Sequence, residues 1–171
     1  MNLSIEIVKL SDERHRLTVR RSDGTEEGAE LETRSFLLHD LVHYAVEAES
    51  GIDDGFWGLL ARGVSMEALS DHTMEKPLGP GIALAERLVG PFQSLWNGRL
   101  ERALYFEHAL GVATFVDDAW LDRVGERLRR LTGAWRAVPV SHALALPWPP
   151  TSDPLVVTAR SAEAILTVGT R

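Results

Sequence analysis

The stretch that decides the fold is LSIEIVKLSDERHRLTVRR, residues 3–21. In each half of this stretch every second residue is apolar: Leu3, Ile5 and Ile7, then Leu17 and Val19. An alternation with a period of two places these side chains on one face of a β-strand. Polar residues at positions 11–14 separate the two halves and are typical of a turn, so the stretch predicts a β-hairpin.

A two-stranded hairpin is only marginally stable in water, so it needs a third strand or a layer of helices. Residues 142–146 are a candidate for the third strand, and residues 155–158 for a short strand near the C-terminus. Between the hairpin and these segments, apolar residues recur at helical spacing. We expect helices over about residues 35–50, 53–60, 81–96, 99–110 and 118–135.

These elements predict an α+β fold. The N-terminal β-hairpin, with the C-terminal strand able to join it, packs on a bundle of about five helices. We expect one domain over residues 1–171. It consists of a β-hairpin segment (1–33), a helical body (34–136), and a strand and proline-rich segment with a tail (137–171).

The composition limits the chemistry of the chain. Its 171 residues are 44% hydrophobic and 25% charged, as in ordinary globular domains, and they include no cysteine. Metal ligands must therefore come from His, Asp or Glu. The net charge of −7 argues against a nucleic-acid partner. The first residues lack the apolar core of a signal peptide and no run is apolar enough for a membrane span. We therefore expect a soluble, cytoplasmic protein without a membrane partner.

The clearest chemical pattern lies on the first expected helix: His39-Asp40-x-x-His43-x-x-x-Glu47. At 100° per residue, the apolar residues of this helix form one face, and His39, His43 and Glu47 follow its edge. Asp40 and Tyr44 fall further toward the polar side. Such an edge can desolvate a titratable group and still leave it accessible, so Asp40 and Glu47 are the candidate catalytic residues.

Two histidines at positions i and i+4 can bind one divalent ion such as zinc, so His39 and His43 are the candidate metal ligands. Glu47 lies about 12 Å along the helix axis from His39. It therefore cannot share an ion with His39, and we expect it to accept a hydrogen bond from His43. The third ligand is open. The candidates are Asp71, His72, Glu107, His108 and His142.

The same segment resembles the His-Glu-x-x-His metalloproteases. The resemblance implies zinc at His39 and His43 and a general base directly after the first histidine. In that family the base is Glu, whereas this chain has Asp40, which is one methylene shorter. We expect the shorter side chain to fall short of a metal-bound water, which argues against proteolysis.

Residues 36–41 also resemble the His-Asp step of the HD-domain metal phosphohydrolases. Those helical proteins need an earlier helical histidine and a late aspartate as well. The histidine before this step is His15, in a stretch that we expect to be a strand, and Asp117 or Asp118 would have to be the late aspartate. We therefore rank this resemblance below the two-histidine site.

The longer stretch from Phe36 to Gly63 is similar to a family of small uncharacterised bacterial proteins. The shared pattern is His-Asp-x-x-His-Tyr-x-Val-Glu followed by Gly55-Phe56-Trp57-Gly58. This resemblance implies no activity. It suggests that the Gly-Phe-Trp-Gly segment packs beside the histidine helix, with glycines that permit close approach.

Two broad interpretations remain open. His39 and His43 either belong to a packed, hydrogen-bonded core edge or form half of a divalent-metal site. Because histidine pairs at this spacing also arise by chance, the sequence favours the packed edge. The matching alternative function is a non-catalytic structural or interaction protein. We expect such a protein to be a homodimer, formed through amphipathic helices or through the free edge of the hairpin.

Overall fold

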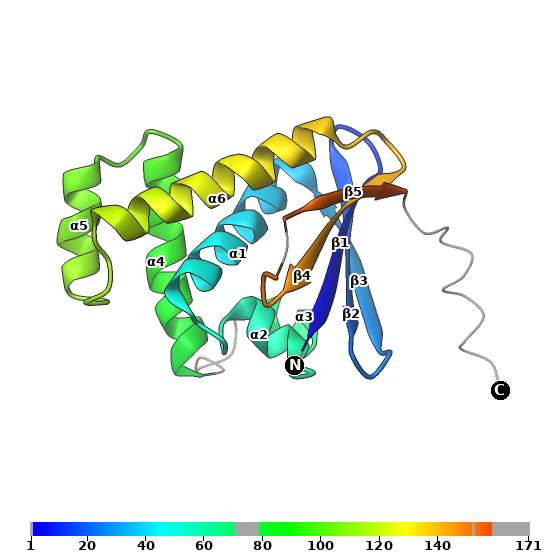
Figure 1. Ribbon diagram of the computed structural model, residues 1–171, viewed down its shortest axis with the longest axis horizontal. Coiled ribbons are helices and arrows are strands. Elements are labelled where there is room, and N and C mark those ends of the chain that lie inside the picture. Colours follow the sequence, from blue (N-terminus) through cyan, green and yellow to red (C-terminus); the bar gives the residue numbers. More distant parts are fainter. Residues whose placement is uncertain (1, 71–78, 152, 159–171) are drawn as a thin grey trace.

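A computed structural model describes residues 2–70, 79–151 and 153–158 of the chain. Its sheet is antiparallel, with the strand order β3-β2-β1-β4-β5 (Figure 1). The strands are β1 (Leu3–Lys9), β2 (Arg14–Arg21), β3 (Glu26–Glu32), β4 (His142–Trp148) and β5 (Leu155–Thr158). The α+β class predicted from the sequence is confirmed.

The N-terminal hairpin and its C-terminal partner strand are both confirmed. Ile5 lies opposite Val19 in β2 and opposite Leu146 in β4, so three apolar side chains meet across the middle of the sheet. This pairing puts β1 between β2 and β4, while β3 covers the other side of β2. Both edges of the hairpin are therefore paired. This corrects the expectation that a homodimer could form through a free edge of the hairpin. The homodimer itself stays a prediction.

Strand β3 is missing from the strands expected from the sequence. Four of its seven residues are glutamates, so its alternation is difficult to see in the sequence. Cross-strand ion pairs join it to β2, with Arg16 bonded to Glu30 and Arg20 bonded to Glu26. A charged strand of this kind is suited to the edge of a sheet, because charge discourages pairing with further strands.

The helical segments follow the predictions closely, with one addition. They are a π-helical turn η1 (Thr33–Leu37), α1 (Leu38–Ser50), α2 (Phe56–Ala61), α3 (Met66–Ser70), α4 (Pro80–Trp96), α5 (Arg102–Leu110) and α6 (Asp118–Ala137). The described ranges thus hold six α-helices where we expected about five, because α3 was not predicted. Among these residues no helix is long and apolar enough to cross a bilayer.

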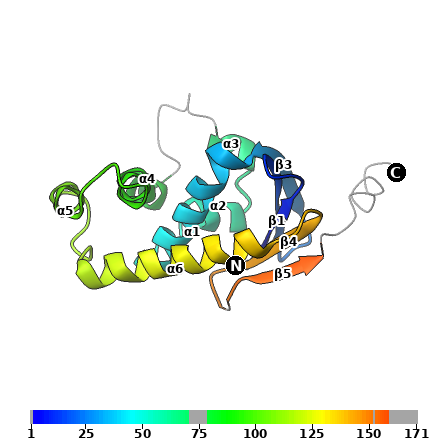
Figure 2. The same cartoon turned by 90° about the horizontal axis from the view of Figure 1, so that it is seen from above.

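The helices all lie on one side of the sheet, as Figures 1 and 2 show from two directions. Helix α1 occupies the middle of this layer, in contact with α6, α4, α2 and η1. Its residues from Asp40 to Glu47 are all buried. A helix that is enclosed on several sides can hold polar side chains in the protein interior. The histidines of α1 therefore lie where side chains of neighbouring helices can contact them.

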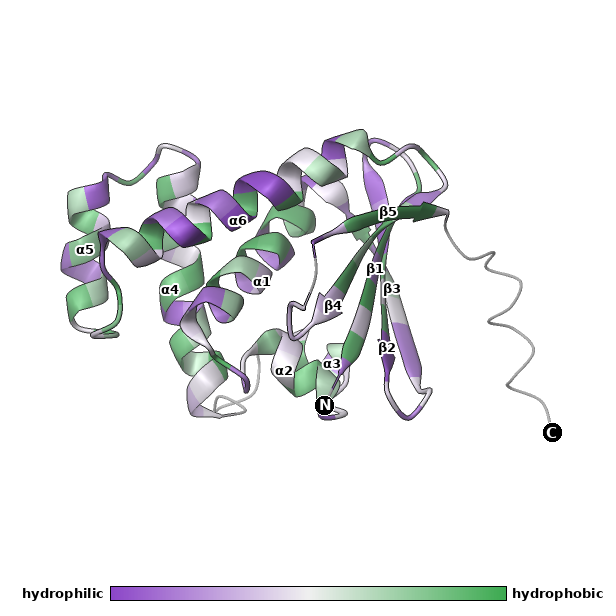
Figure 3. Cartoon of the chain, in the orientation of Figure 1, coloured by the Kyte–Doolittle hydropathy of each residue, from purple (hydrophilic) through white to green (hydrophobic). Residues whose placement is uncertain are grey.

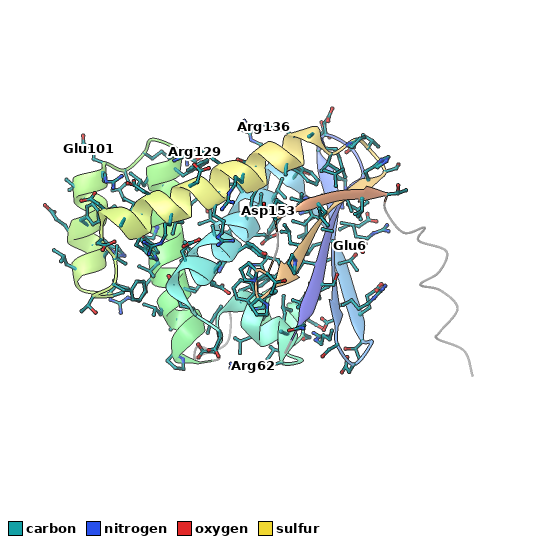
Figure 4. The ribbon with its side chains drawn as sticks, in the orientation of Figure 1. Glu6, Arg62, Glu101, Arg129, Arg136 and Asp153 are labelled. Carbon is teal, nitrogen blue, oxygen red and sulfur yellow. The ribbon has the colours of Figure 1, made fainter. Side chains whose placement is uncertain are left out.

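Helix α6 covers α1 with an amphipathic surface, and hydrophilic and hydrophobic residues alternate along it in Figure 3. Its outer side carries arginines such as Arg129 and Arg136, which Figure 4 labels. Several of the helix's arginines pair with acids: Arg123 and Arg127 with Glu49, and Arg130 with Asp153. These pairings describe a solvated helix face with its charges largely neutralised.

Candidate metal site

Two histidines of α1 and one glutamate of α4 converge on a single point. The Nε2 atoms of His39 and His43 lie 3.2 Å apart. An Oε1 atom of Glu86 lies 3.4 Å from His43 Nε2. One ligand atom from each of the three residues lies within 4.8 Å of the other two, which meets the spacing needed to hold one metal ion.

The other ring nitrogens of the two histidines are occupied by acceptors. His39 Nδ1 lies 3.1 Å from Gln93 Oε1, and His43 Nδ1 lies 2.9 Å from Glu47 Oε1. An oxygen acceptor requires the proton on Nδ1, and this assigns the lone pair of each neutral ring to Nε2. When both rings are neutral, two lone pairs and a carboxylate oxygen therefore face one another. A cation placed between them would stabilise the arrangement.

The Glu47 carboxylate is the anchor of His43. Besides the His43 ring, it accepts hydrogen bonds from the backbone N–H of Phe56 at 2.9 Å and of Trp57 at 3.1 Å. The residue is fully buried. Both amides belong to the first turn of α2, whose positive end favours a negative charge. This agrees with the hydrogen-bond role expected for Glu47, while its catalytic role remains a prediction.

Gly55 explains how Glu47 reaches the start of α2. A Cβ atom at this position would lie 2.5 Å from the Glu47 carboxyl carbon, which is closer than Cβ atoms approach non-bonded atoms in proteins. The Phe56 ring then packs 5.5 Å from the His43 ring, and Trp57 lies 6.2 Å from Tyr44. The Gly-Phe-Trp segment therefore packs beside the histidine helix, as the sequence suggested.

Protonation of the site follows from these contacts. Burial lowers the pKa of His43, but hydrogen bonds to Glu47 and Glu86 outweigh burial and raise it to about 9. Burial raises the pKa of Glu47, while His43 and the two amides oppose that shift. With three N–H donors around the carboxylate, we place the shared proton on His43 Nδ1. At neutral pH the His43 ring of the metal-free protein is therefore protonated on both nitrogens. The proton on Nε2 lies at the point where a metal ion would bind.

Asp40 differs from its predicted position on the polar side of the helix. Only 8% of its surface is exposed, and its Oδ2 atom has no hydrogen-bond partner among the residues that the structure describes. Burial raises its pKa to about 7, with the nearby charge of His43 opposing the shift. The helical wheel failed here because α1 is enclosed on several sides and not only along its apolar face. A catalytic role for Asp40 remains a prediction.

The third member of the cluster, Glu86, was not among the candidates named from the sequence. His108 instead lies 2.9 Å from the Arg87 carbonyl, His142 lies 3.3 Å from the Val140 carbonyl, and Glu107 is exposed on α5. Asp71 and His72 fall outside the described residues. One signal in the sequence could have pointed to Glu86. It lies on a predicted helix two turns before Gln93, the residue that contacts His39, so the two side chains share one face of that helix.

The residues required by an HD-type site have other contacts. His15 is buried in β2, with Nδ1 3.2 Å from Thr33 Oγ1 and its ring edge-on to Trp135. Burial lowers its pKa to about 4. Asp117 accepts a hydrogen bond from the N–H of Trp120 at the start of α6, and Asp118 pairs with Arg102.

No protein-family model, curated protein or solved structure matches this chain. The resemblances to the metalloproteases, the HD-domain proteins and the bacterial Gly-Phe-Trp-Gly family therefore stay predictions. Any functional conclusion has to come from the geometry of the site.

Proposed function

We propose that this protein binds one divalent metal ion of the zinc type through His39 Nε2, His43 Nε2 and the Glu86 carboxylate. The observation that carries the proposal is the convergence of these three potential ligand atoms. Tetrahedral zinc with bonds of about 2.0–2.1 Å separates its ligand atoms by about 3.3–3.4 Å. The two distances of 3.2 Å and 3.4 Å around His43 Nε2 are close to that value.

The surroundings of the ligands support the same proposal. The Nδ1 atoms of both histidines bond to oxygen atoms, an arrangement that fixes ring orientation at metal sites. Glu47 adds negative charge behind His43, which makes Nε2 a stronger ligand. His and carboxylate ligands together suit zinc and similar divalent ions, and this chain has no thiolate to offer.

The number of ligands favours a reactive ion over a structural one. Structural zinc sites are closed by four protein ligands, whereas catalytic sites use three and leave one position for water. The Glu86 side chain is 54% exposed, so solvent reaches the site from the α4 side. A bound ion would lower the pKa of a water at this position, and the reaction class that this supports is hydrolysis.

The proposal is tested by metal content after dialysis against zinc and then against metal-free buffer. We expect one equivalent in the wild type and none in the His39→Ala/His43→Ala double variant. Glu86→Ala should lower the affinity strongly, while Glu126→Ala, an acid of matched exposure at 55%, should leave it unchanged. A wild type that retains no metal, or a double variant that retains a full equivalent, would contradict the proposal.

A further inference from the structure

One loop contacts both helices that carry the ligands. Asp54 lies in the connection between α1 and α2, directly before Gly55, which is packed against Glu47. On the other side, Asp54 Oδ2 accepts a hydrogen bond from the N–H of Gly81, at 3.1 Å, in the first turn of α4. Two consecutive loop residues thus contact both sides of the site. Gly55 contacts Glu47, which bonds to His43, and Asp54 contacts the helix that carries Glu86.

The contact between Asp54 and Gly81 depends on the absence of a side chain at Gly81. A Cβ atom on Gly81 would lie 1.7 Å from Asp54 Oδ1, so the carboxylate occupies the space where a side chain would otherwise be. The N-cap residue Gly79 has no side chain to satisfy the free amides of α4. Asp54 therefore supplies from the neighbouring loop the acceptor that the helix start lacks.

This contact lies on the same helix as Glu86 and close to it in the sequence. Glu86 follows Gly81 by five residues on the same helix, or about 7.5 Å along its axis. Metal–ligand distances tolerate deviations of only about 0.2 Å. On the side of α4 that follows Glu86, Gln93 Oε1 lies 3.1 Å from His39 Nδ1 of α1. Asp54 holds the helix on the side before it.

We infer that Asp54 is a positioning residue for the metal site, which sets the distance of Glu86 from His43 through its contact with Gly81. This inference rests on the proposed metal-binding function and goes beyond it, because Asp54 itself is not a ligand. It also gives a reason for the Asp-Asp-Gly-Phe-Trp-Gly sequence that follows the histidine helix: Asp54 positions one ligand and Gly55 admits the carboxylate that anchors another.

The test uses the full chain and Co²⁺, whose visible absorption distinguishes a compact four-coordinate site from a looser one. Asp54→Ala should lower Co²⁺ affinity by roughly tenfold or more and alter the spectrum. Asp54→Asn, which keeps an oxygen acceptor, should restore most of both. Asp53→Ala is the matched control. That neighbouring residue is exposed and pairs with Arg62, so its loss should change neither affinity nor spectrum.

A second variant covers the case in which Asp54→Ala does not fold. Asp54→Glu keeps the charge but adds a methylene at a contact without spare room, so it should weaken Co²⁺ binding in a folded protein. If Asp54→Ala and Asp54→Glu bind Co²⁺ as the wild type does, with the same spectrum, the inference is overturned and the metal site stands. If the wild type binds no Co²⁺ and no zinc, the proposed function fails as well.

Discussion

Glu47 connects three parts of the site, so a change that removes only its charge is informative. The carboxylate accepts three N–H donors, whereas the amide of Glu47→Gln has one oxygen and turns its NH₂ group toward a donor. We expect this variant to lose about 2–3 kcal/mol of stability and about 10–100-fold in zinc affinity. Denaturant unfolding and competition with a zinc indicator measure the two effects.

Glu49→Gln is the control for this prediction. Glu49 lies two residues further along α1 and pairs with Arg123 and Arg127 of α6, away from the two histidines. Its change should cost some stability and leave zinc affinity unaltered. Equal zinc affinity in the wild type and Glu47→Gln would show that the carboxylate does not support the metal ligand.

Asp40 makes stability depend on pH in a direction that can be stated in advance. Its pKa rises from 3.8 to about 7 on folding, because the side chain is buried. Between these values the unfolded chain releases a proton that the folded protein keeps, so the free energy of unfolding falls as pH rises from about 4 to 7. Asp40→Asn removes this dependence. In metal-free protein the variant should be more stable at pH 8 by up to about 4 kcal/mol, and the gain should vanish toward pH 4.

Unfolding of both proteins across that pH range checks the prediction. Parallel curves for wild type and Asp40→Asn would mean that the buried carboxyl does not retain its proton. His15 contributes an opposite slope in both proteins, because burial lowers its pKa to about 4. The difference between the two curves removes that contribution.

At the residue scale the sequence predicted local geometry and missed distant partners. The hydrogen bond from His43 to Glu47 follows from one turn of helix, so it could be predicted. Glu86 lies 43 residues beyond His43, and the contact depends on how α4 packs on α1, which helical periodicity does not specify. The burial of Asp40 was missed for the same reason, since it depends on elements that α1 meets only after folding.

At the element scale, the approach of α2 to α1 depends on Gly55. In Gly55→Ala the new methyl group would collide with the Glu47 carboxylate, which three hydrogen bonds hold in place. We expect a loss of about 1–3 kcal/mol in stability and weaker zinc binding. Thermal unfolding and zinc titration of the same samples measure both.

Gly133→Ala provides the matched comparison within a helix. In the described part of the chain, nothing lies within 4 Å of a Cβ atom at this position of α6. The added methyl should therefore stabilise the helix by up to about 1 kcal/mol and leave zinc affinity unchanged. If Gly55→Ala were as stable as Gly133→Ala, the close packing of α2 against Glu47 would be refuted.

The elements themselves were predicted where their residues alternate or repeat clearly. The stripe of α6 and the alternation of β1 are visible because one face of each is apolar. Strand β3 escaped prediction because its glutamates obscure the pattern, and its position depends on ion pairs with β2. The short α3 has no buried residue, so nothing in its sequence separates it from a loop.

At the scale of the whole molecule, the metal site joins α1 and α4 across the helical layer. An ion that binds only the folded chain stabilises it, by about 2.7 kcal/mol at a free concentration 100 times the Kd. For a chain of this length that corresponds to a rise in Tm of roughly 5–10 °C. Calorimetry with zinc and with a chelator should show this difference in the wild type. The His39→Ala/His43→Ala variant should show none, and an equal rise in that variant would place the ion elsewhere.

The most direct test of the central claim is the X-ray absorption spectrum of the zinc-loaded protein at the metal edge. The proposed site predicts four neighbours at about 2.0–2.1 Å, two of them imidazole nitrogens and two oxygens, from Glu86 and a water. In Glu86→Ala the imidazole signals should persist while a protein oxygen is replaced by solvent. A spectrum with one imidazole or none, or six distant oxygen neighbours, would contradict a site built from His39, His43 and Glu86.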